Sequence, residues 1–207
     1  MVYTGGDDLF VIGTWNDIIE FAVDLRTAFK EFSSGKITMS AGIGIFTENY
    51  PVYQMAKRTG ELEELAKNYS KDNQTPTKDA IALFGKMSNT VDTVYPWDEF
   101  IDEVLYRKYK YIKSVTTFNE RENSEKIFVG KSKWYKIMDL IRDILDKNEK
   151  LDIARFAYIL ARINYNNKNE ENYKEFKKEL FRWIKNPKDA KQLLTAINIR
   201  IYEKRGE

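Results

Sequence analysis

Residues 2–13 read VYTGGDDLFVIG, so two glycines and two aspartates stand between two short apolar runs. Residues 2–3 and 9–12 have the β-branched and aromatic composition of strands, and glycine is a usual residue of the tight turn that joins two strands. The stretch therefore predicts a β-hairpin whose turn includes Gly5 and Gly6. It also places two like charges at the hairpin tip, where they oppose folding unless a positive group compensates them.

Asp7 and Asp8 are candidate ligands of a divalent cation. Two neighbouring carboxylates, on a backbone whose glycines leave room for phosphate, suit Mg²⁺ or Mn²⁺ that keeps some waters and takes its other ligands from a nucleotide. Bending at the turn would let both side chains converge on a pair of ions. The local pattern leaves a second interpretation open, because Gly-Gly and Asp-rich stretches are also common in ordinary polar turns.

The chain up to residue 84 alternates strand and helix patterns. Thr14 with Asp17 predicts a capping-box start for a helix. The apolar face of that helix is predicted from residues at helical spacing: Ile18, Phe21, Ala22, Leu25 and Phe29. KITMSAGIGIF (36–46) predicts a buried strand whose glycines permit a close approach to its backbone. Pro51 opens a helix that runs to about Lys67, and residues 80–84 predict a last strand.

Beyond Pro96 only helical periodicity is found. A helix is expected from Trp97 to about Val115. Three later helices carry apolar stripes, the first of them after a cap at Ser132. The stripes contain Trp134, Ile137, Met138, Ile141, Leu145, Ile153, Phe156, Ala157, Leu160, Tyr173, Phe176, Leu180 and Trp183. Asn186 with Pro187 caps and starts a final helix, which carries Leu193, Leu194, Ile197 and Ile201. The fold class is therefore α+β, with residues 1–88 as a mixed domain and 89–207 as an all-α helical bundle.

The composition of the 207 residues excludes several kinds of site. The chain has no cysteine and no histidine, which removes disulfides, thiolate and imidazole metal sites and His-based catalysis. The lack of cysteine is consistent with a reducing cytoplasm, and no apolar run is long enough to span a membrane. Lys and Arg (34) nearly balance Asp and Glu (32), so any contact with nucleic acid must be local.

A local basic and aromatic stretch does occur: YRKYKYIKSV, residues 106–115. Tyrosines interleaved with Lys and Arg can stack on bases and bind phosphate. Helical spacing spreads these charges over much of the circumference, however. The pattern favours an amphipathic helix with half-buried tyrosines and solvated lysines, and leaves RNA binding as the alternative.

YTGGDDLFVIG, ITMSAGIGIF, GELEELAK and DAIALFG, in this order and spacing, resemble the palm domain of the large subunit of type III CRISPR interference complexes, particularly type III-A. That palm is a ferredoxin-like domain shared with cyclases bearing GGDEF-type motifs and with polymerases. The resemblance covers the C-terminal half of the palm and extends, less specifically, over the helical tail. It implies a partial ferredoxin-like domain followed by the C-terminal helical domain of that subunit.

The resemblance also implies an activity. In the family, the palm converts ATP into cyclic oligoadenylate second messengers when the complex binds a target RNA, as part of antiviral defence. It implies that Gly5 and Gly6 form the turn beside the nucleotide and that Asp7 and Asp8 hold two Mg²⁺ or Mn²⁺ ions for a metal-dependent nucleotidyltransferase. Lys67 matches a lysine that faces the triphosphate, unless it is a solvated helix-end residue. Ser40 lies where the family's strand lines the nucleotide pocket, unless it is simply a small packed residue.

Two departures from the family pattern limit this expectation. No strand bearing a further acidic residue precedes the hairpin, and no His-containing nuclease domain is present. We therefore expect a C-terminal piece of a longer protein, with an incomplete site that is inactive in isolation. In this topology the missing strand would lie between two strands that are present.

The sequence leaves three functions open. The first is the cyclic oligoadenylate synthase, working in the cytoplasm with the small helical subunits, the subunit that binds the guide end, and guide and target RNA. The second is a non-catalytic scaffold that binds the small subunits or RNA of the complex. The third, a diguanylate cyclase, is weaker because Asp8 stands where those enzymes have Glu.

Overall fold

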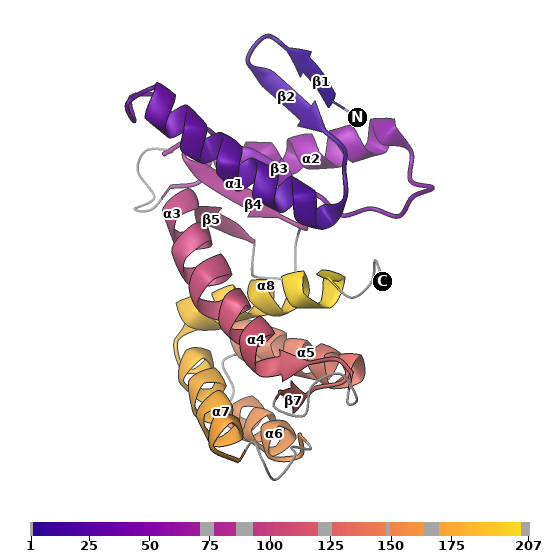
Figure 1. The fold of residues 1–207 in the computed structure, drawn as a ribbon, viewed down its shortest axis with the longest axis vertical. Helices are drawn as coiled ribbons and strands as arrows, with labels where there is room; N and C mark the ends of the chain where they lie inside the picture. Colours follow the sequence, from indigo (N-terminus) through magenta and orange to yellow (C-terminus); the bar gives the residue numbers. More distant parts are fainter. Residues whose placement is uncertain are drawn as a thin grey trace. The chain divides into compact units, whose positions relative to one another are not determined.

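The computed structural model describes residues 2–70, 77–85, 93–119, 126–147, 150–163 and 170–203. Contacts divide them into two units, the first comprising residues 2–85 and 93–101 and the second beginning at residue 102. The predicted domain boundary, between residues 88 and 89, lies outside the described residues. The α+β fold class is confirmed, with the strands and helices of the first unit followed by a mostly helical second unit (Figure 1).

The first unit contains the predicted order of hairpin, helix, strand, helix and strand. Its elements are β1 (Val2–Gly5), β2 (Asp8–Val11), α1 (Trp15–Phe32), β3 (Ala41–Ile43), α2 (Val52–Lys67), β4 (Ala80–Leu83), β5 (Val94–Pro96) and α3 (Trp97–Glu99). The hairpin β1–β2 is a sheet of its own, and β3, β4 and β5 form a second sheet in that order. Strands β3 and β4 are parallel, whereas β4 and β5 are antiparallel.

Two strand predictions need correction. The strand predicted over residues 36–46 is too long, because only the three residues of β3 pair, with Ile81 to Leu83 of β4. Strand β5 was not predicted, because three residues are too few for a clear period of two. It pairs with the buried strand β4 and so extends the sheet on the side away from β3.

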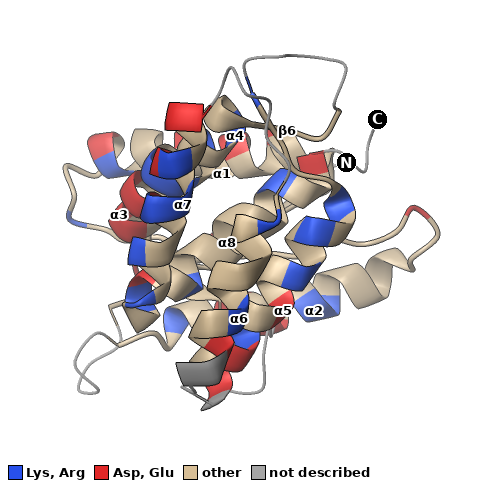
Figure 2. Ribbon diagram, turned by 90° about the horizontal axis from the view of Figure 1, so that it is seen from below, with Lys and Arg blue, Asp and Glu red and all other residues tan. Residues whose placement is uncertain are grey.

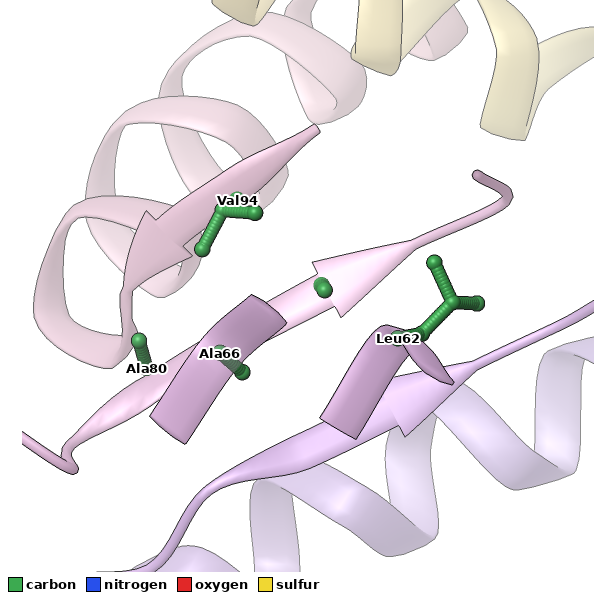
Figure 3. Packing of buried hydrophobic residues seen from close by; sticks show 5 residues of the cluster. Leu62, Ala66, Ala80 and Val94 are labelled. Carbon is green, nitrogen blue, oxygen red and sulfur yellow. The ribbon is translucent and has the colours of Figure 1, made fainter. Parts of the chain in front are cut away.

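Helix α2 packs on this sheet through small residues. Leu62 and Ala66 lie against Ala80, Ala82 and Val94 in a buried cluster (Figure 3). Ala66 and Ala80 are fully buried, so the helix and the strands approach closely at this point.

The close approach is tightest at Gly42 of β3. A Cβ atom at this position would lie 2.4 Å from the carbonyl oxygen of Thr59 and 2.5 Å from the backbone nitrogen of Glu63, both in α2. The prediction that glycines in this strand permit a close approach is therefore confirmed, and the approaching element is α2.

The buried face of α1 differs from the predicted one. Ile19, Ala22 and Arg26 are buried, whereas Phe21 is 43% exposed. Arg26 can be buried because its Nη2 lies 2.9 Å from Oδ2 of Asp79, which directly precedes β4. The capping box was also wrong: Thr14 is the N-cap residue, but its hydroxyl donates to Oδ1 of Asn16 and makes no capping bond to the backbone.

The second unit begins within the π-helix η1 (Phe100–Tyr109), at residue 102. Its further elements are α4 (Lys110–Val115), β6 (Thr116–Thr117), β7 (Ile127–Phe128), α5 (Lys131–Lys147), α6 (Lys150–Ala161), α7 (Glu170–Ile184) and α8 (Pro187–Glu203). The helix expected over 97–115 is present, with a π-helical middle that was not predicted. The short parallel pair β6–β7 was not predicted either, so the tail is not purely helical.

The core of the second unit confirms the main apolar stripes. Trp134, Ile137 and Ile141 of α5 are fully buried, and Trp134 meets Phe176 of α7 edge to face. Helix α8 is buried on nearly all sides, including Thr195 and Arg200, so it is the central helix of this unit. Asn186 caps it as predicted, with Oδ1 accepting a hydrogen bond of 2.9 Å from the backbone N–H of Lys188. None of the described helices is long and apolar enough to cross a membrane.

Candidate functional site

The hairpin tip is a two-residue turn. Gly5 pairs with Asp8 across the hairpin, which leaves Gly6 and Asp7 as the loop residues. Gly6 has φ +66°, the left-handed conformation that glycine adopts without a steric penalty. Glycine at the first of two loop positions is typical of a type II′ turn, whose twist matches that of the strands. The turn therefore needs Gly6, and it places Asp7 in the loop and Asp8 at the first position of β2.

Both carboxylates are open to solvent. Asp7 and Asp8 are exposed, and a Cβ atom added at Gly6 would have no neighbour within 4 Å. Neither carboxylate makes a hydrogen bond or an ion pair with the residues that the structure describes. Two adjacent carboxylates without a cationic partner are chemically suited to a hard divalent cation.

The described chain supplies only part of a metal site. Within the described residues, no group of three or more His, Cys, Asp or Glu could hold an ion. Two carboxylates still fit Mg²⁺ or Mn²⁺, because these ions readily take water and phosphate oxygens as their remaining ligands. Asp7 and Asp8 are therefore the residues here that could hold such an ion.

Lys67 lies within the electrostatic range of this tip. It is the last residue of α2, and its Nζ lies 2.9 Å from Oε1 of Glu63. The hydrogen bond to Glu63 raises the pKa of Lys67; burial opposes this shift, and the charges of Glu63, Asp8 and Glu64 add to it. Among the predicted site residues, Asp8 is thus one whose charge acts on Lys67, although the two belong to separate elements.

Ser40 belongs to the other sheet, directly before β3. Its hydroxyl oxygen is buried and has no hydrogen-bond partner among the residues that the structure describes. Burial agrees with the interpretation of Ser40 as a small packed residue. The missing partner agrees with the interpretation as a ligand-contacting residue, because an unpaired buried hydroxyl carries a desolvation cost that a ligand could relieve.

Glu63 was missed as a site residue. It precedes Lys67 by four positions on the same helix, and Glu followed by Lys at this spacing is a recognised favourable pair. The signal was present in GELEELAK, but the sequence does not show that the charges of Glu63 and Asp8 both act on Lys67.

Several side chains of the basic segment 106–115 are buried or half-buried within the second unit. Lys108 is fully buried, so the prediction of solvated lysines was wrong at this position. Its Nζ lies 2.7 Å from Oδ1 of Asp189 and 2.6 Å from Oε1 of Gln192. The predicted half-burial is confirmed for Tyr109 and Tyr111. Figure 2 shows basic and acidic segments mixed on the helices, in agreement with the balanced charge.

Two family models match the chain. Residues 1–81 match the second palm domain of Cas10/Cmr2. Residues 110–206 match the second helical domain of the Cmr2 subunit of the CRISPR RNA silencing complex.

Curated relatives are similar along the whole chain. A protein of Mycobacterium tuberculosis is 36% identical over 207 residues, which is 100% of this chain and 23% of the relative. A protein of Streptococcus thermophilus is 38% identical over 210 residues, or 100% of this chain and 25% of the relative. Each is described as a CRISPR system single-strand-specific deoxyribonuclease Cas10/Csm1 of subtype III-A. The chain thus spans about a quarter of the length of these relatives.

Proposed function

The chain belongs to the Cas10/Cmr2 family of CRISPR large subunits, with a palm domain followed by a helical domain, and from this premise we propose that its hairpin is the metal-binding part of a cyclic oligoadenylate synthase. The substrate is ATP, and the products are second messengers made in antiviral defence when the complex binds target RNA. The synthesis takes place in the cytoplasm. The observation that supports the proposal most strongly is the exposed, unpaired Asp7–Asp8 pair at the tip of a tight glycine turn.

The reaction joins two ATP molecules. The ribose 3′-hydroxyl of one attacks the α-phosphate of the other, a new P–O bond forms, and pyrophosphate leaves. A bound pair of Mg²⁺ or Mn²⁺ ions would activate the hydroxyl and neutralise charge on the phosphates. Asp7 and Asp8 would hold these ions through their carboxylate oxygens. Gly6 leaves open space for the nucleotide, since a Cβ atom there would have no neighbour within 4 Å, whereas a Cβ atom at Gly5 would meet the Tyr3 side chain at 3.4 Å.

Lys67 and Ser40 complete the nucleotide contacts. The ammonium group of Lys67 stabilises the triphosphate, and its position within reach of Asp8's field supports this role. The Ser40 hydroxyl donates to the nucleotide, and its lack of a partner supports this role. Further ligands come from elsewhere in the large subunit, since two carboxylates leave most of an ion's coordination sphere to other oxygens.

The site is tested in the complete large subunit, assembled with its partner subunits, guide RNA and target RNA. Replacing Asp7 and Asp8 together by Asn should abolish oligoadenylate formation from ATP and leave assembly intact. Asp24→Asn is the matched control, because Asp24 is an exposed aspartate of α1 in the same unit. Synthesis retained by the double variant would refute the assignment, and product from GTP rather than ATP would identify a diguanylate cyclase instead.

A second function, a scaffold that binds the small subunits or RNA, is favoured by one feature of the second unit. Its exposed tyrosines Tyr106, Tyr135 and Tyr158 are 53%, 37% and 60% exposed, and exposed aromatic side chains are suited to partner contacts. In this case, changes at these tyrosines would release the partners, and the double Asn variant would signal normally.

A further inference from the structure

One carboxylate, that of Glu63, is paired with the proposed phosphate-binding lysine, Lys67. Glu63 and Lys67 are four residues apart on α2, and their side chains are 34% and 39% exposed. Their positions follow from the packing of α2, because Leu62 and Ala66 are buried against the sheet and each is followed by one member of the pair. The pair therefore lies at the border of the buried face, with its geometry fixed by a rigid helix.

Lys67 already has an anionic partner in the absence of a nucleotide. Its Nζ lies 2.9 Å from the Glu63 carboxylate, with Glu preceding Lys, the favourable order for an i, i+4 pair. As the last residue of α2, Lys67 also lies at the negative end of the helix dipole. A phosphate group that takes Lys67 as a ligand therefore shares the ammonium group with the Glu63 carboxylate or displaces it, because the ammonium group has three N–H donors.

The same carboxylate repels the ligand. Lys67 is within the field of both Glu63 and Asp8, so a triphosphate bound at Lys67 has Glu63 as a close negative neighbour. Asp7 and Asp8 can bind a cation that offsets their charge, whereas the only cation within bonding distance of Glu63 among the described residues is Lys67 itself.

We propose that Glu63 is a positioning residue that holds the Lys67 ammonium group and lowers the affinity of the site for nucleoside triphosphates, because its carboxylate competes with phosphate oxygens for Lys67 and repels their negative charge. This inference rests on the proposed function. Its chemical signature is specific: Glu63 acts on the charge of the β- and γ-phosphates, not on the base or on the chemical step. A lower affinity in the absence of target RNA would keep the site free of nucleotide until metal ions bind and target RNA activates the complex.

The test measures equilibrium binding of ATP, AMP and inorganic tripolyphosphate to the complete large subunit. Glu63→Gln keeps the size and hydrogen-bonding capacity of the side chain but removes its charge. It should tighten the binding of ATP and of tripolyphosphate by about three- to tenfold, the range expected for one partly exposed charge near a polyanion, and leave AMP binding unchanged. In synthesis assays, KM for ATP should fall by the same factor at constant kcat.

Glu64→Gln is the matched control, because Glu64 is the adjacent residue, carries the same charge and is exposed without an ion pair to Lys67. It should change binding less than twofold. In a Lys67→Met background the effect of Glu63→Gln should shrink, since the two residues act as one unit. High salt should also reduce it.

Two outcomes would overturn the inference: tripolyphosphate binding that responds equally to Glu63→Gln and Glu64→Gln, or binding that weakens in Glu63→Gln. The Asp7/Asp8 double Asn variant separates this failure from that of the proposed function. If that variant loses synthesis while Glu63→Gln behaves like Glu64→Gln, only the role of Glu63 is wrong. If it retains synthesis, the proposed function itself fails.

Discussion

Replacing Gly42 by Ala should disrupt the contact that holds α2 on the sheet. The new methyl carbon would lie 2.4 Å from the Thr59 oxygen, 2.5 Å from the Glu63 nitrogen and 2.8 Å from Leu62 Cβ. These distances are about 1 Å shorter than the ~3.5 Å at which non-bonded atoms pack without repulsion. Two of the three atoms belong to the helix backbone, so a change of rotamer cannot relieve the clash and α2 must move as a body.

We expect Gly42→Ala to lower the free energy of unfolding by about 3 kcal/mol, the upper part of the range for overpacked cores. Gly60→Ala is the matched control, because Gly60 lies in the same helix and an added Cβ there would have no neighbour within 4 Å. That change should stabilise α2 by about 0.5–1 kcal/mol through helix propensity.

Urea unfolding followed by tryptophan fluorescence measures both variants, since Trp97 is fully buried in the first unit. A loss below about 1 kcal/mol for Gly42→Ala would refute the packing argument, because no rearrangement short of moving the helix accommodates the methyl group. Because α2 also carries Glu63 and Lys67, the same variant should weaken triphosphate binding, whereas Gly60→Ala should not.

Three further predictions concern the second unit. Lys108→Met should destabilise it by about 2–4 kcal/mol in urea unfolding, because Asp189 loses a buried cationic partner; a loss below about 1 kcal/mol would show that the pair adds nothing. Burial, followed by the charges of two nearby glutamates, raises the pKa of Tyr111 to about 12. Its contribution to stability is therefore complete below about pH 10 and is lost as the pH rises from about 10 to 12. Tyr111→Phe should lose less stability than the native protein over this range, and identical pH profiles of the two proteins would contradict the shift. Asn186→Ala should cost about 1 kcal/mol of unfolding free energy by removing the cap of α8, with Asn186→Ser retaining most of it.

The elements with local signals were predictable from the sequence. The hairpin follows from Gly6, whose left-handed conformation few other residues adopt without strain. Helix α2 begins after Pro51 and ends at Lys67, as its pattern indicates. The cap at Asn186 is likewise a property of a few neighbouring residues.

The features that depend on distant partners were not predictable. Arg26 is buried because Asp79, 53 positions away, neutralises it, and Lys108 is buried because Asp189, 81 positions away, does the same. Charge alone places such residues on the surface. The candidate site has the same character: the hairpin carboxylates were visible in the sequence, but the effect of the Asp8 charge on Lys67 depends on the packing of separate elements.

The most direct test of the central claim is the binding of Mn²⁺ to the complete large subunit in the presence of ATP, measured by electron paramagnetic resonance. The account predicts that Mn²⁺ binds with ATP to the native protein and to Asp24→Asn, and that replacing Asp7 and Asp8 together by Asn removes the bound signal. Equal Mn²⁺ binding by the double variant and the native protein would show that the hairpin carboxylates are not metal ligands, and would contradict the account.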